Sequence, residues 1–184
     1  MLDKEAALKR MILPGKFYGF SWNKMYKASL IGEQRYHEEI LKGEDSPFSC
    51  EYILKCNKII VQDIPLYHYR IDSLSISRSK FSVKKMTVLN SYMGIVKLLE
   101  EKGYSDKLIE MQKVQYANQL LSLKINIIKS DIEKFKKELN YIDIEMKKYL
   151  EVYMKSSDID LKHKIAYTFG VYRESLLILM CKVM

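Results

Sequence analysis

Two adjacent carboxylates, Glu44 and Asp45, are the residues best suited to chemistry in this sequence. A glycine turn at Gly43 leads into them, and the apolar spacing from Asp45 to Cys56 predicts a helix. Backbone N–H groups and the helix dipole favour the ionised form of a carboxylate at a helix N-terminus, which suits a general base. Taken alone, the motif more often marks a helix N-cap beside a solvated glutamate.

A second candidate segment, Tyr67-His68-Tyr69-Arg70, has the composition of a short strand that follows Pro65. Strand alternation would place His68 and Arg70 on one face, where an imidazole and a guanidinium could serve a divalent metal and a diphosphate. A polar and basic loop that contains Ser75 comes next. The alternative is a half-exposed edge strand with an ordinary turn.

A third candidate is Trp22, the only tryptophan of the chain, which is followed directly by Asn23 and Lys24. An indole offers an apolar face, and its two polar neighbours offer hydrogen bonds, so the three could line a sugar or nucleotide site. A large aromatic side chain is more often a core anchor, and that alternative stays open from these residues alone.

These three segments lie in the first of two parts of different character. Residues 1–80 contain all three prolines and have runs of strand length at 58–64 and 66–69, so we expect a mixed α/β part there. Residues 81–184 contain no proline and show helical periodicity. The predicted fold class is mainly α (α+β): a partial α/β segment of about two strands at 1–80, then an all-helical extension of about four helices at 81–184.

The helical part has recognisable starts and stops. Apolar periodicity predicts helices over 82–102 and 105–129, with Gly103 as a left-handed cap between them. Ser130 and Glu133 have the spacing of a capping box, in which each side chain satisfies an orphan backbone N–H, and predict the start of a third helix.

A last helix, which Ser157 or Asp158 is expected to cap, is apolar nearly all round after Glu174. Its main apolar stripe consists of Leu161, Ile165, Phe169, Tyr172, Leu176, Leu179 and Val183. Such a surface must be covered by the fold, by a partner or by a lipid interface. Packing within the protein or a homo-oligomer is one explanation for residues 161–184, and contact with a membrane surface is the other.

Composition and charge exclude several classes of protein. The 184 residues are 48% hydrophobic and carry a net charge of +8, with basic and acidic residues interleaved, so we expect no nucleic-acid partner. No apolar run reaches the roughly 20 residues of a membrane span. The three cysteines do not have disulfide-scaffold or metal-site spacing, which favours a cytoplasmic location, with peripheral contact at the inner face of the membrane as an alternative.

In order along the chain, three runs resemble a known family. They are Trp-Asn-Lys-Met-Tyr at 22–26, Gly-Glu-Asp-x-x-Phe at 43–48, and Pro-Leu-Tyr-His-Tyr-Arg at 65–70. Over about residues 5–80 they resemble the C-terminal part of bacterial family 2 glycosyltransferases, which build capsular, exopolysaccharide or wall glycans. The resemblance implies a Rossmann-like, GT-A type domain that binds a nucleotide-diphosphate sugar.

The resemblance also implies roles for individual residues. Asp45 would be the base that deprotonates the acceptor hydroxyl in an inverting transfer, with Glu44 in the same pair. The substrate-binding residues would be Trp22, Asn23, Lys24, Arg70 and Ser75. His68 would be a ligand of a divalent metal, manganese or magnesium, in the complete enzyme. The partners would be a nucleotide-diphosphate sugar and a glycan or lipid-linked acceptor.

The chain departs from that family in lacking its first, nucleotide-binding half. No Asp-x-Asp occurs in residues 1–80, and Asp158-Ile159-Asp160 is better explained as a helix cap. The expectation is therefore a fragment of a metal-dependent glycosyltransferase that is inactive alone. The alternative function is a non-enzymatic helical module for protein interaction or membrane-surface association through the last helix.

Overall fold

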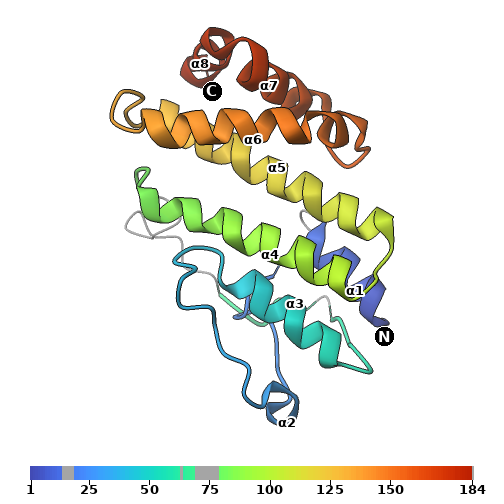
Figure 1. Ribbon diagram of the computed structural model, residues 1–184. Coiled ribbons are helices and arrows are strands. Elements are labelled where there is room, and N and C mark those ends of the chain that lie inside the picture. Colours follow the sequence, from blue (N-terminus) through green and yellow to red (C-terminus); the bar gives the residue numbers. More distant parts are fainter. Residues whose placement is uncertain (14–18, 63, 69–78, 184) are drawn as a thin grey trace.

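The computed structural model describes residues 1–13, 19–62, 64–68 and 79–183, and they form a mainly helical protein, as predicted (Figure 1). A short 3₁₀ helix, Val83–Met86, precedes the helical part. The α-helices are α1 Lys4–Ile12, α2 Ala28–Ile31, α3 Asp45–Lys55, α4 Thr87–Glu101, α5 Asp106–Ile128, α6 Lys136–Lys155, α7 Leu161–Tyr172 and α8 Glu174–Val183.

The long helices are stacked one beside the next (Figure 1). α5 lies at the centre and packs against α4 on one side and α6 on the other. α1 and α3 lie on the α4 side of the stack, whereas at the opposite end α7 packs on α6, and α8 packs on α7 and α5. The start of α3 and the α7–α8 pair therefore lie at opposite ends of the molecule.

The strands predicted at 58–64 and 66–69 are not seen in the described residues of these segments. Only an isolated antiparallel bridge joins Leu2 and Ile59, with N–H···O distances of 2.8 and 3.3 Å. Strand pairing needs a neighbouring strand and a covered face, and among the described residues Ile60, which is 73% exposed, has neither. The apolar run here is surface chain.

Two hydrophobic clusters hold the stack together. One joins α1, α3, α4 and the start of α5 around Leu8, Ile53 and Leu99. The other joins α5 to α6, α7 and α8 around Leu120 and Ile142. Because α1 and α3 share their core with α4 and α5, the start of α3 is supported by the helical part, although the division of the chain into domains at residue 80 stays a prediction.

The first two predicted helices are confirmed as α4 and α5, and Gly103 has a φ of 67° between them. The predicted capping box is wrong. α6 begins only at Lys136, and in the turn before it Asp131 accepts a hydrogen bond from the Lys134 N–H at 3.0 Å. Phe135 is buried against Phe81, with ring centroids 4.7 Å apart, and this tertiary contact delays the helix beyond the local signal.

The last predicted helix is two helices. Asp160, rather than Ser157 or Asp158, caps α7 by accepting a hydrogen bond from the His163 N–H at 2.8 Å. The helix is interrupted at Arg173, where φ is −145° and ψ is 64°, and α8 begins at Glu174. In the part of the chain that the structure describes, no helix is long and apolar enough to cross a bilayer.

A buried lysine on α5 fixes the junction between α7 and α8. Lys124 is 1% exposed, and its Nζ donates to Asp143 on α6 at 2.5 Å and to the Gly170 carbonyl at 2.8 Å. It also pairs with Glu174, the first residue of α8, at 2.9 Å. Three helices are thus tied to α5 through one ammonium group, because each of its donors has an acceptor on a different element.

Candidate functional site

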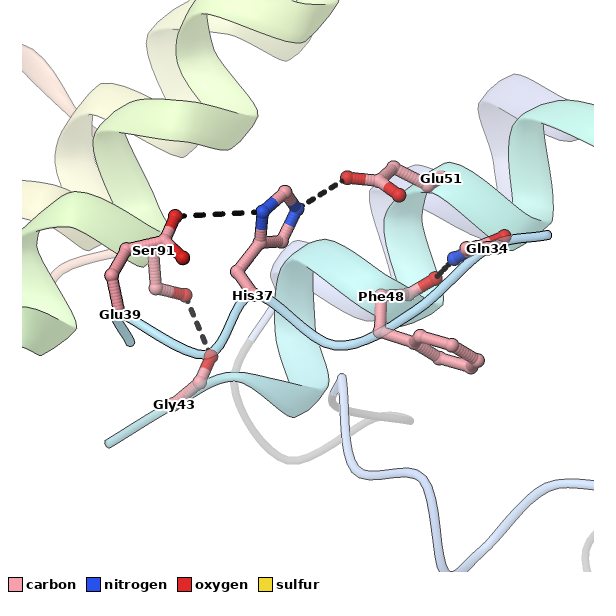
Figure 2. Close-up of polar contacts among 7 residues, drawn as sticks. All are labelled: Gln34, His37, Glu39, Gly43, Phe48, Glu51 and Ser91. Carbon is pink, nitrogen blue, oxygen red and sulfur yellow. Dashed lines mark hydrogen bonds and ion pairs between the residues drawn. The ribbon is translucent and has the colours of Figure 1, made fainter. Parts of the chain in front are cut away.

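The turn that precedes α3 is held against α4. Gly43 has a φ of 82°, which favours glycine, and its carbonyl accepts a hydrogen bond from Ser91 Oγ at 2.7 Å (Figure 2). A Cβ at Gly43 would meet a Val88 methyl at 3.1 Å. The backbone N–H groups of Leu41 and Lys42 donate to Thr87 Oγ1 on α4. The position of Asp45 is therefore set by α4.

The loop before this turn is fastened to α3. His37 lies between two carboxylates, 2.8 Å from Glu51 and 3.6 Å from Glu39 (Figure 2). Gln34 Nε2 donates to the Phe48 carbonyl at 2.7 Å. These contacts fix the loop on the side of α3 where Glu51 lies.

Asp45 is the first residue of α3, as the sequence predicts, and is half-buried. Its Oδ1 accepts a hydrogen bond of 2.6 Å from Ser21 Oγ, a residue 24 positions earlier. Glu44 is the N-cap, and its backbone carbonyl accepts a hydrogen bond from the Phe48 N–H at 3.5 Å. One carboxylate oxygen of Asp45 is thus oriented by a hydroxyl from another segment.

The segment that carries Ser21 runs along the first turn of α3. Ser49 Oγ donates to the Gly19 carbonyl at 2.8 Å. A Cβ at Gly19 would lie 2.5 Å from Ser46 Oγ and 2.7 Å from Ser46 Cα. Only glycine permits this approach, so Gly19 is what allows Ser21 to reach Asp45.

Lys24 lies close enough to Asp45 for their charges to interact. Its Nζ donates to the Phe20 carbonyl and to Asn23 Oδ1, both at 2.6 Å. Burial lowers the pKa of Lys24 to about 8, and the negative charge of Asp45 acts in the opposite direction. The carboxylate and the amine thus share one partly desolvated region.

Three aromatic rings form a row at the edge of this region. The ring centroids of Phe20 and Trp22 are 5.1 Å apart, and those of Trp22 and Tyr67 are 4.5 Å apart, with both pairs stacked. Trp22 is 36% exposed, so it is not the core anchor that the sequence left open as an alternative. We use the term Asp45 site for Asp45 with Ser21, Lys24, Trp22 and Tyr67.

Two tyrosines behind the row support the loop. The Tyr26 hydroxyl lies 3.1 Å from Ser49 Oγ, and the Tyr52 hydroxyl accepts a hydrogen bond from the Lys27 N–H at 2.6 Å. Their rings meet edge to face at 4.8 Å. Burial raises the pKa of Tyr26 and of Tyr52, which fits hydroxyls that serve as structural hydrogen-bonding groups.

The structure brings together only part of the predicted set. The segment that holds residues 22–24 reaches Asp45 through Ser21, and Tyr67, the neighbour of exposed His68, stacks on Trp22. Arg70 and Ser75 lie outside the described residues. The sequence missed the roles of Ser21 and Tyr67, although Ser21 is directly before Trp22 and Tyr67 directly before His68.

The described residues do not provide a ligand set for the metal that the resemblance implies. Among the residues that the structure describes, no group of three or more His, Cys, Asp or Glu side chains is arranged to hold an ion. Exposed His68 alone does not make a site, because a catalytic divalent cation needs several protein ligands. We therefore derive no chemical step through a metal from these residues.

Comparison with known proteins gives one partial match. No protein-family model matches the chain, and no solved structure matches it. A Bacillus subtilis (strain 168) protein named "Putative glycosyltransferase EpsH" is 37% identical over 71 residues, which is 36% of this chain and 21% of that protein. The chain thus spans about a fifth of the length of that relative, and the match supports a relation to glycosyltransferases.

Proposed function

We propose that this chain carries the acceptor side of an inverting, metal-dependent family 2 glycosyltransferase, with Asp45 as the general base. The observation that supports this most is the hydrogen bond of 2.6 Å from Ser21 Oγ to Asp45, which joins the segment of Trp22 and Lys24 to the start of α3 across 24 residues. The partial match to a protein named as a glycosyltransferase supports the same class. The donor would be a nucleotide-diphosphate sugar and the acceptor a glycan or a lipid-linked sugar.

In this mechanism, the Asp45 carboxylate takes the proton of an acceptor hydroxyl as that oxygen attacks the anomeric carbon of the donor. The new bond joins the acceptor oxygen to that carbon, and the bond from the carbon to the diphosphate oxygen breaks on the opposite face, which inverts the configuration. Ser21 holds Oδ1, so Oδ2 is the oxygen that receives the proton. The metal and the groups that bind the diphosphate belong to the part of the enzyme outside the described residues.

The aromatic row would hold the acceptor. Sugar rings have an apolar face that packs on an aromatic ring, and their hydroxyls need polar partners at its rim. Trp22 is stacked with Phe20 and Tyr67, so the exposed ring surface of the row is chiefly that of Tyr67, and Asn23 and Lys24 provide polar groups in the same segment as Trp22. Because Ser21, the neighbour of Trp22, donates to Asp45, we expect a sugar held at this row to bring a hydroxyl to that carboxylate.

The test uses an enzyme in which this chain is joined to a nucleotide-sugar-binding half. Asp45→Asn keeps the size of the side chain and its contact with Ser21 but removes the base, so we expect transfer to fall by at least about a hundredfold. Donor binding, measured by calorimetry, is expected to stay within about twofold because Asp45 lies on the acceptor side. Equal loss of transfer and donor binding would remove Asp45 from the role of base.

A further inference from the structure

The outer face of α7 is apolar and exposed. Leu161, Ile165 and Tyr172 are 72%, 40% and 65% exposed, respectively. At 100° per residue these three positions fall on one face of the helix, and the opposite face, with Ala166 and Tyr167, is buried against the rest of the protein. The sequence identified this stripe, but most of its members point away from the core. We call Leu161, Ile165 and Tyr172 the α7 face.

α8 also exposes apolar side chains. Leu176 and Leu179 are 40% and 59% exposed, whereas Leu177 and Cys181 turn inward. Together α7 and α8 form the layer at one end of the stack, remote from α3 (Figure 1). Scattered single apolar residues are normal on a protein surface, but five on two consecutive helices indicate an interaction surface.

Basic residues border the α7 face. Helical geometry places Lys162 on one side of it and Lys164 on the other, and Arg173 and Lys182 are exposed further along the chain. Residues 161–183 contain four basic residues and one acid, Glu174, and the carboxylate of that acid is bound to buried Lys124. The surface therefore combines apolar side chains with an excess of positive charge.

The acids nearest to this face offset only part of that charge. Asp160 caps α7, and its carboxylate interacts electrostatically with Lys162, which leaves Lys164, Arg173 and Lys182 as the excess basic residues. Asp158 is exposed but lies before the helix. A second copy of this chain seated on the α7 face would bring the same lysines and Arg173 together, and like charges directly opposed across an interface are repulsive. A polyanionic surface is the complementary partner.

We propose that the α7 face is a docking surface for anionic phospholipid, with its apolar side chains in the headgroup region and Lys162 and Lys164 on the lipid phosphates. An apolar stripe bordered by lysines is the arrangement by which a helix lies in a membrane interface without crossing it. The contact involves the end of the molecule opposite α3, so it is independent of the chemistry proposed for Asp45.

The first experiment is co-sedimentation of the 184-residue chain with vesicles. We expect binding to phosphatidylcholine vesicles that contain about 30% phosphatidylglycerol, and at least about tenfold weaker binding to pure phosphatidylcholine, because basic residues near an anionic surface contribute about 1 kcal/mol each. Salt at about 1 M, where the Debye length is about 3 Å, is expected to weaken binding to the anionic vesicles. Equal binding to both vesicles, or to neither, would overturn the proposal.

Paired variants locate the surface. Lys162→Glu with Lys164→Glu is expected to reduce binding to the anionic vesicles by at least about tenfold. The matched control, Lys136→Glu with Lys137→Glu, makes the same change in net charge at exposed positions of α6 and is expected to reduce binding by less than about threefold. Similar losses in both pairs would mean that overall charge, and not the α7 face, attracts the vesicles.

A second pair tests the apolar part. Leu161→Ser with Tyr172→Ser is expected to weaken binding by at least about tenfold, since two exposed apolar side chains leave the interface. The control is Tyr141→Ser with Ile144→Ser, which removes comparably exposed apolar side chains from α6 and should preserve binding. If light scattering instead shows a dimer that only the α7 variant dissociates, a second copy is the partner and the lipid proposal is wrong.

Discussion

The two ends of the helical stack both expose aromatic and apolar side chains, but they present them differently. At the α3 end, Trp22 is stacked on Phe20 and Tyr67 beside a carboxylate that a hydroxyl orients. At the other end, Leu161 and Tyr172 stand on the outside of a helix between lysines. Fixed rings beside a fixed polar group can recognise one small molecule, whereas an apolar stripe with charged borders matches an extended surface.

The two ends of the stack also differ in the interactions that hold them in place. Three separate segments converge on the Asp45 site, and backbone geometry at Gly19 and Gly43 controls their approach. The α7–α8 layer depends instead on packing and on the single buried ammonium of Lys124. We therefore expect the two ends to respond to different substitutions.

The largest effect is expected at the α7–α8 end from Lys124→Ala. The substitution removes one partner of two carboxylates and leaves a cavity at a site that is 1% exposed, so we expect the free energy of unfolding to fall by about 3 kcal/mol. Chemical denaturation measures this change. Lys113→Ala on the same helix breaks a partly exposed pair with Glu100 and should change stability by about 1 kcal/mol or less.

If both variants lose the same small amount of stability, the Lys124 cluster does not hold α8 in place. In addition, Trp22 emission should be unchanged in folded Lys124→Ala, because the cluster lies in the α5–α8 core, away from the Asp45 site. A changed emission would mean that the two ends are coupled.

A smaller effect is expected at the α3 end from Gly19→Ala. The new Cβ would collide with the backbone and side chain of Ser46, so we expect about 2 kcal/mol of destabilisation and loss of the Ser21–Asp45 contact. Gly94→Ala is the control, since a Cβ there meets nothing within 4 Å and lies inside α4. Removing this helix-interior glycine is expected to stabilise the protein by about 0.5–1 kcal/mol.

Thermal unfolding distinguishes the two glycine variants by the sign of the change in Tm. A Gly19→Ala protein as stable as the parent would show that the loop does not approach α3 as closely as described. In that case the close approach at Gly19 would not explain how Ser21 reaches Asp45.

The smallest effect concerns the charge of Lys24. Because burial lowers its pKa to about 8, native Lys24 loses its proton between about pH 8 and the ordinary lysine value of about 10.5, while the unfolded chain keeps it. The unfolded state binds more protons in this window, so the contribution of Lys24 to stability rises with pH there. Pulsed acetylation followed by peptide mass spectrometry should show half-maximal reactivity of Lys24 near pH 8.

The Asp45→Asn variant tests whether the charge of Asp45 affects the pKa of Lys24. The negative charge of Asp45 favours protonated Lys24, so its removal should lower the pKa of Lys24 further. The comparison residue is Lys155, an exposed lysine whose pKa is raised by its ion pair with Glu151 and which should react only at higher pH in both proteins. An unchanged Lys24 profile in Asp45→Asn would contradict the proximity of the two groups.

Local patterns predicted α3, α4 and α5. The apolar spacing from Asp45 onwards predicted α3, and Gly103 predicted the end of α4. Both signals depend on residues a few positions apart, and both are confirmed. Features that depend on distant residues were not predictable in this way. The run at 58–64 has strand composition but meets only a single bridge at Ile59, and the capping box at Ser130 yields to the burial of Phe135.

The same division applies to the Asp45 site. Asp45, Trp22 and Lys24 could be selected as candidates because their residue types carry chemistry. The contact of Ser21 with Asp45 and the stacking of Tyr67 on Trp22 join residues 24 or more positions apart, and no periodicity reports such contacts. The break at Arg173 also had no sequence signal, since the apolar pattern continues through it.

The single tryptophan makes the central claim, that the Asp45 site binds a sugar acceptor, directly measurable in this chain. A panel of hexose and N-acetylhexosamine oligosaccharides is titrated while Trp22 emission is recorded. The account predicts a saturable change in emission for at least one member, which Tyr67→Ala weakens by about tenfold and Asp45→Asn by less than about threefold. Emission that no member of the panel changes, or a response that Tyr67→Ala leaves intact, would contradict the account.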